Sequence, residues 1–167
     1  TTLTQNGARH SRFEGFFLGT AIDLEADGQP SLGATADDLT PSLGPDDEDG
    51  VNLVNSELQP GQMNGVKVYL TSPTTGRLDA WVDFNQDGGF DDKTERIFTA
   101  EALNPGNNNL GFHVPQSAKS GPSYARFRLS HKGGIPAHGD GGPGEVEDCI
   151  FEVTTPQGDL DFGDAPQ

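Results

Sequence analysis

The chain of 167 residues contains a single cysteine, Cys149, so no intrachain disulfide can form. We expect this cysteine to be a small buried hydrophobic residue in a strand. No stretch approaches the ~20 apolar residues that a membrane-spanning helix needs, and no signal peptide is recognised. Basic residues are also scarce, with 10 Lys and Arg against 26 Asp and Glu, and they form no patch. The formal net charge of −16 therefore disfavours nucleic acid and anionic membranes as partners.

Helical patterns are missing too. Only 32% of the residues are hydrophobic, and 23 Gly and 12 Pro make up about one residue in five. The 17 Asp outnumber the 9 Glu, and Asp favours turns and metal loops where Glu favours helices. This composition favours short strands that are joined by tight turns.

Alternation of apolar and polar residues is the dominant pattern. It is strong in four segments and weaker in four others, with turn signals between them. The strong segments are 65–72, 77–84, 123–130 and 148–153, and the weaker ones are 13–20, 51–54, 96–99 and 110–114. Seven or eight short strands of this kind predict an all-β fold, an antiparallel β-sandwich with long acidic loops.

The segment DFNQDGGFDD, residues 83–92, resembles the first half of a calcium loop. Oxygen-bearing side chains occupy every second position, and a glycine at the sixth allows the sharp turn. Position twelve is Thr94, and the nearest acid is Glu95, one residue late, so the loop is not an EF-hand. The predicted ligands are the side chains of Asp83, Asn85, Asp87 and Asp91, the carbonyl of Gly89, and Glu95 as the distal carboxylate.

The acid-rich region 23–50 contains four leucines and no other large apolar residue. It is either a solvated loop or a second calcium-binding region, because a long loop in a compact domain needs something to order it. The spacing of Asp23, Glu25 and Asp27 before Gly28 repeats that of the first loop. We list Asp23, Glu25, Asp27, Asp47 and Asp49 as candidate ligands of further calcium ions.

A third acidic cluster, GEVED at residues 144–148, begins the last predicted strand. Arg126 and Arg128 share one face of the preceding predicted strand and could pair with its carboxylates. Alternatively, Glu145 and Asp148 could complete a calcium site with the acidic loop. Both interpretations remain open, because one carboxylate can bridge an arginine and a metal.

These motifs together resemble the GEVED domain family, which is named after the motif at 144–148. The resemblance extends over most of the chain. It includes NGARH at 6–10, LGTAIDLEADGQPS at 18–31, DDEDGV at 46–51, LDAWVDFNQDG at 78–88 and YARFRLS at 124–130. It implies an extracellular, calcium-stabilised β-module of a large secreted or cell-surface bacterial protein, often present as tandem repeats. DFGDAP at 161–166 is typical of the start of a next repeat, so we expect a module at 1–155 and a linker from 156 to 167.

Calcium is the one cofactor we expect, and the function we expect is that of a structural or adhesion module. The partners would be calcium ions, neighbouring repeats and extracellular polysaccharide. The alternative is a calcium-dependent, lectin-like module in which Trp81 and Tyr124 contact sugar. We expect no enzyme activity, because the acids cluster in Gly-rich loops and no G-x-S-x-G motif is present.

Overall fold

The computed structural model describes residues 2, 4, 6–11, 13–20, 49–90 and 93–154. Within these residues the chain forms nine strands and no α-helix. The strands are β1 (Arg9–Ser11), β2 (Phe17–Leu18), β3 (Val51–Leu53), β4 (Met63–Thr71), β5 (Gly76–Val82), β6 (Arg96–Leu103), β7 (Gly106–His113), β8 (Gly121–Ser130) and β9 (Asp140–Val153). No helix of the described part is long and apolar enough to span a membrane.

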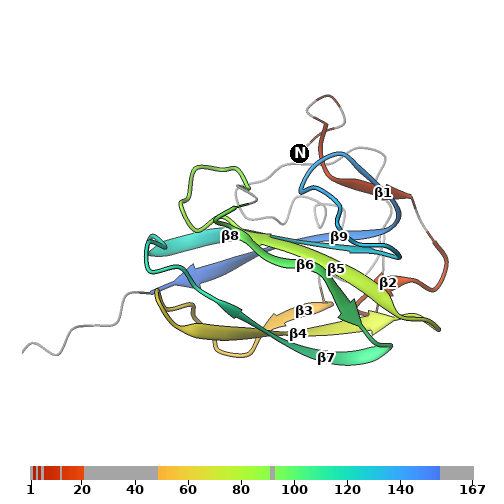
Figure 1. The fold of residues 1–167 in the computed structure, drawn as a ribbon, viewed down its shortest axis with the longest axis horizontal. Helices are drawn as coiled ribbons and strands as arrows, with labels where there is room; N and C mark the ends of the chain where they lie inside the picture. Colours follow the sequence, from red (N-terminus) through yellow and green to blue (C-terminus); the bar gives the residue numbers. More distant parts are fainter. Residues whose placement is uncertain are drawn as a thin grey trace, which may run out of the picture.

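The strands form two open sheets, which lie one above the other in Figure 1. The five-stranded sheet has the order β1-β9-β8-β5-β6. In the four-stranded sheet, β4 pairs with β2, β3 and β7. Every pairing between these strands is antiparallel except that of β1 with β9, which is parallel.

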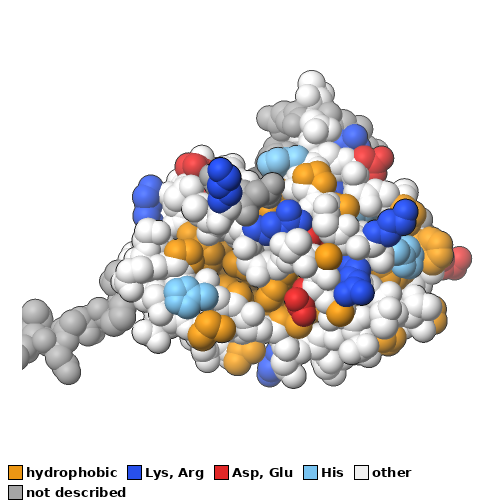
Figure 2. All heavy atoms as spheres, viewed as in Figure 1, with side chains coloured by type: hydrophobic (Ala, Val, Ile, Leu, Met, Phe, Trp, Pro, Cys, Tyr) orange, Lys and Arg blue, Asp and Glu red, His pale blue; other side chains and the backbone are white. Residues whose placement is uncertain are grey.

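The hydrophobic core lies between the two sheets, and the alternation along each strand decides which side chains reach it. In β4, Val66, Val68 and Leu70 are buried while Lys67 and Tyr69 are exposed. These apolar residues belong to one cluster with core residues of β5, β8 and β9. In Figure 2, hydrophobic side chains gather along the middle of the visible face, between the two layers. Burial of this apolar area is the main favourable contribution to folding.

The strand β8 is unusual because it is buried on both faces from Ala125 to Ser130. Its inward side chains, such as Phe127 and Leu129, join the hydrophobic core. Its outward side chains, Arg126 and Arg128, are also buried. Backbone carbonyls of the loop between β8 and β9 accept hydrogen bonds from both arginines. The five-stranded sheet therefore has a second, polar layer on its outer side.

The predicted all-β fold with two sheets is confirmed, and each of the eight predicted segments overlaps one observed strand. Two features differ from the prediction. The short β1 is an additional strand, and β9 begins at Asp140, eight residues before the predicted start. The prediction for Cys149 is only partly correct, since this residue lies in β9 and packs against the core but is half-buried.

Candidate metal centre

The loop that follows β5 curls around the carboxylate of Asp83, which is only 2% exposed. Its two oxygens accept the backbone N–H groups of Asp87, at 3.1 Å, and Gly88, at 2.9 Å. The N–H of Asp83 itself donates to the carbonyl of Tyr124 on β8. Gly88 has a φ of +81°, a conformation that glycine adopts without steric cost. The predicted turn at the sixth position is therefore present.

Asn85 and Glu95, ten residues apart, meet inside this loop. The backbone N–H of Asn85 donates to Oε1 of Glu95 at 3.2 Å, and Glu95 is 1% exposed. The side-chain Oδ1 of Asn85 is buried and accepts no hydrogen bond from any described residue. Buried polar atoms are nearly always satisfied, so such an oxygen calls for an explanation. A hard cation would supply one, because its ligands are carbonyl and carboxylate oxygens.

The other predicted ligands of this loop are Asp87, Gly89 and Asp91. Asp87 is exposed, and its Oδ1 accepts the N–H of Gly89 at 2.8 Å. Asp91 lies outside the described residues. Among the residues that are described, no three His, Cys, Asp or Glu side chains are grouped to hold a metal ion. An ion in this loop would therefore also need amide or backbone oxygens, or residues beyond that part of the chain.

The acid-rich region is represented by only one described candidate, Asp49, because Asp23, Glu25, Asp27 and Asp47 fall outside the described residues. Asp49 binds Thr20, which is 29 residues earlier. Its Oδ1 accepts the Thr20 N–H at 2.8 Å, and its Oδ2 accepts the Thr20 hydroxyl. Both carboxylate oxygens thus have protein partners.

The two glutamates of the 144–148 motif point inward, towards the opposite sheet. Glu145 accepts the N–H of Leu18 in β2. Glu147 accepts the N–H groups of Gly50 and Val51, at 3.0 and 3.2 Å, where β3 begins. Both glutamates are buried, with 8% and 4% of their surface exposed. They tie the ends of β2 and β3 to β9 across the interior of the domain.

Asp148 lies on the opposite side of β9 and forms an ion pair with Arg126. The pair is bidentate, with Nε–Oδ1 at 2.7 Å and Nη2–Oδ2 at 2.5 Å. The guanidinium also lies 5.3 Å from the centre of the Phe90 ring. The predicted arginine–carboxylate ladder is therefore correct for this pair. It is wrong for Glu145, which is on the other face of β9 and binds backbone instead.

Arg128 is fully buried, and each of its guanidinium nitrogens donates a hydrogen bond. Among the described residues, none of these bonds goes to a carboxylate. Its Nη1 donates to Pro136 and His138 carbonyls, and its Nη2 to those of Arg9 and Gly139. The pKa of Arg128 is lowered to about 10, mainly by burial and to a lesser degree by the nearby Arg126 cation. This side chain holds the loop before β9, and β1 beside it, against the sheet.

The outer layer continues around Asp79, which is also fully buried. Its Oδ1 forms a 2.5 Å ion pair with Arg96, and its Oδ2 accepts the N–H of Ile135 at 3.2 Å. The Arg96 guanidinium lies 4.8 Å from the centre of the Trp81 ring. Asp79 and Trp81 are two residues apart on β5, so they share one face of that strand, and both are fully buried there.

The two candidate sugar-binding residues differ in exposure. Trp81 is completely buried, so its ring has no exposed face on which a sugar could stack. Tyr124 is half-buried. If the domain binds a saccharide through an aromatic side chain, another ring is a better candidate than Trp81.

The fold and these contacts define a two-sheet, all-β domain in which an acidic motif on β9 connects the sheets. Residues 77–152 match the sequence model of the GEVED domain family. The family that the motifs predicted is therefore confirmed over β5 to β9, while β1 to β4 lie outside the match. No curated protein showed a significant match.

The comparison with solved structures includes the Pseudomonas fluorescens alkylpurine DNA glycosylase AlkC, bound to DNA that contains an abasic site analog. The similarity covers 63% of this chain and 30% of that chain, with 12% sequence identity and a TM-score of 0.37. A similarity at this level carries no argument about function.

Proposed function

We propose that this domain is a calcium-stabilised, non-enzymatic module of an extracellular or cell-surface protein, with a structural or adhesive role. The observation that carries the proposal is the orphaned Oδ1 of Asn85. It lies in a loop with alternating oxygen side chains and two almost fully buried carboxylates, those of Asp83 and Glu95. Calcium would supply the missing partner of this oxygen and compensate the buried negative charge.

The composition supports the same proposal. A formal net charge of −16 makes a compact chain repel itself, and bound divalent cations reduce that repulsion. The chain also has no disulfide to stabilise it. Extracellular calcium modules work with Kd values of about 10⁻⁴–10⁻³ M, so even weak sites would be filled outside the cell.

The ligands that we propose for the first ion are Asp83, Asn85, Glu95 and Asp87, with Asp91 and the carbonyl of Gly89 completing the set. Further ions would involve the acid-rich region with Asp49, Glu145 and Asp148. In the proposed organisation, residues 1–155 form the module and 156–167 lead into a following repeat.

Thermal unfolding in calcium and in EGTA tests the proposal. At calcium concentrations 100 times Kd, one site adds about 2.7 kcal/mol to the free energy of unfolding. For a domain of this size, we expect the melting temperature to rise by about 5–10 °C per site. An unchanged melting temperature after chelation, together with no heat of calcium binding in calorimetry, would contradict the proposal.

Two variants test whether this loop is the calcium site, and a third controls for the loss of one negative charge. Asn85→Ala removes the orphaned oxygen without changing the charge, and Asp87→Ala removes a carboxylate that is exposed in the loop. Both should lower calcium affinity and reduce the melting difference between calcium and EGTA. Glu101→Ala removes an exposed acid on β6 and should keep that difference. Equal calcium responses of all three variants and the parent would exclude this loop as the site.

A further inference from the structure

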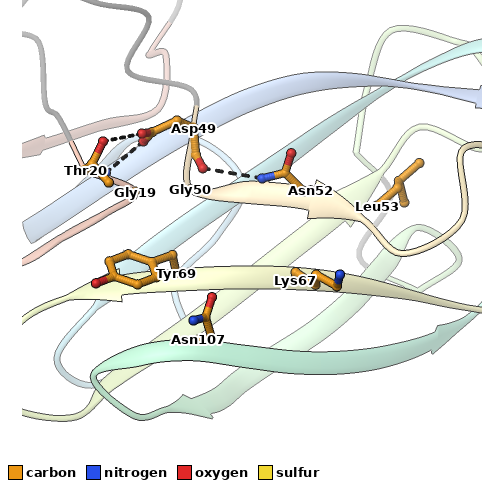
Figure 3. A pocket seen from close by; sticks show the side chains of 9 residues that line it. All are labelled: Gly19, Thr20, Asp49, Gly50, Asn52, Leu53, Lys67, Tyr69 and Asn107. Atoms are coloured by element: carbon orange, nitrogen blue, oxygen red, sulfur yellow. Dashed lines mark hydrogen bonds between the residues drawn. The ribbon is translucent and has the colours of Figure 1, made fainter.

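The outer face of the four-stranded sheet contains a hollow of about 430 Å³. Figure 3 shows the side chains around it, which come from β3, β4 and β7 and from the segments that flank β2 and β3. The polar and aromatic side chains of the lining are those of Thr20, Asp49, Asn52, Lys67, Tyr69 and Asn107. This volume is within the range of about 300–1,000 Å³ that is typical of small-molecule sites.

The register of the sheet explains why these side chains lie together. Tyr69 on β4 is opposite Asn107 on β7, and Lys67 is opposite Asn52 on β3. Their neighbours in β4, Val66, Val68 and Leu70, point into the core, so the alternate positions must point outward. Adjacent strands therefore present an aromatic ring, an ammonium group and two amides on one surface.

Several of these groups are available to a ligand. Lys67, Tyr69 and Asn107 make no side-chain hydrogen bond to another residue that the structure describes, and Tyr69 is 38% exposed. Amides supply both donors and acceptors, and a tyrosine supplies an apolar ring face with a polar hydroxyl. Asp49, by contrast, is already engaged by Thr20.

The chemistry of the lining selects the class of ligand. A pyranose ring has an apolar C–H face and a rim of hydroxyls that both donate and accept, which matches one exposed ring surrounded by amides. A purely apolar ligand would cover the amide and ammonium groups of this lining without offering them a hydrogen-bond partner. A polyanion would find one lysine on a chain with a formal net charge of −16.

We propose that this hollow binds a neutral saccharide, with the sugar ring against Tyr69 and its hydroxyls bonded to Asn107 and Asn52. Lys67 donates a further hydrogen bond to a hydroxyl or ring oxygen. The site involves neither Trp81 nor Tyr124. None of the proposed ligands of the first ion lines the hollow, whereas Asp49, which we propose as a ligand of a further ion, does.

The test uses the whole chain and soluble hexasaccharides of cellulose, xylan and mannan, with oligogalacturonate as the acidic comparison. Binding is followed by calorimetry and by amide chemical-shift changes. We expect at least one neutral oligosaccharide to bind, Tyr69→Ala to weaken it about tenfold or more, and Tyr69→Phe to retain most of the affinity. Asn107→Ala should weaken binding severalfold. Met63→Ala changes an exposed side chain on the same strand outside the hollow and should have no effect.

Three results would overturn the inference. The first is that no neutral oligosaccharide binds at millimolar concentration. The second is that only oligogalacturonate binds. The third is that Tyr69→Ala leaves the affinity unchanged. The calcium proposal is judged by melting and the saccharide site by ligand binding, so the failure of one is distinguishable from the failure of the other. Circular dichroism of each variant confirms that a loss of binding is not a loss of folding.

Discussion

His10 accepts the Nε–H of Arg128 through its own Nε2, at 3.1 Å, although the two residues are 118 positions apart. The other ring nitrogen, Nδ1, is 3.1 Å from the carbonyl oxygen of Gly142. A carbonyl can only accept, so Nδ1 carries the proton and the ring is neutral. This histidine therefore joins β1 to β8 and β9 in one specific tautomer.

Protonation of His10 should destabilise the domain. The pKa of His10 is lowered from its ordinary 6.5 to about 4, mainly by burial and to a lesser degree by the Arg128 cation. The Gly142 carbonyl and Asp140 raise this pKa, but their effect is smaller. Between these two pH values the unfolded chain binds a proton that the folded chain does not. The free energy of unfolding should therefore fall as the pH drops from about 6.5 to about 4, by at most about 1.4 kcal/mol per pH unit from this residue.

Chemical denaturation at several pH values in this range measures that effect. The matched variant is His10→Gln, whose amide oxygen can accept the Arg128 hydrogen bond but does not titrate. Its stability should depend less on pH than that of the parent over the same interval. Parallel curves for the two proteins would show that His10 does not set this part of the pH dependence.

Removing Glu147 should separate the two sheets at one end. Glu147→Ala leaves the N–H groups of Gly50 and Val51 without their acceptor in a buried position. Each unsatisfied buried donor costs about 1–3 kcal/mol, so we expect a loss of at least about 2 kcal/mol. Glu147→Gln keeps an amide oxygen that can accept both bonds and should lose less.

Hydrogen exchange locates the damage caused by these variants. In Glu147→Ala, the amides of β3 should lose protection more than those of β5 and β8 in the centre of the five-stranded sheet. If both variants unfold at the same denaturant concentration as the parent, Glu147 does not stabilise β3 as proposed.

The alternating pattern predicted most of the strands because one face of each meets the core and the other meets solvent. β4 illustrates this: its predicted range of 65–72 differs from the observed Met63–Thr71 by two residues at most. The first eight residues of β9 lack such a pattern, because glycines and a proline occupy much of that segment. Residues 144–147 become a strand by pairing with the end of β8, and the start of β9 pairs with β1 at Asp140 and Pro143. Long-range pairing of this kind is not visible in local sequence.

The direction of the motif glutamates could have been predicted from the same alternation. Glu145 and Glu147 have the parity of Cys149, Phe151 and Val153, the core-facing residues of β9, so they belong to the inner face. Their pairing with the arginines was one of two open interpretations, and it rested on the expectation that two consecutive predicted strands lie side by side. Their true partners are backbone groups of β2 and β3, about 100 residues or more away, which only the three-dimensional structure shows.

Gly144 begins the motif because no larger residue fits there. A Cβ on Gly144 would lie 1.9 Å from the carbonyl oxygen of Leu129 and 2.8 Å from Nδ1 of His10, and the residue has a φ of +156°. Gly144→Ala must therefore strain the backbone and push β9 away from β8. Backbone strain alone costs about 1–3 kcal/mol, so we expect a total loss of at least about 2 kcal/mol.

The control is Gly142→Ala, where φ is +71° but a Cβ would meet nothing within 4 Å, and about 1 kcal/mol should be lost. Urea denaturation of both variants separates the steric effect from the conformational one. Equal losses would show that the close approach of Leu129 does not explain the glycine.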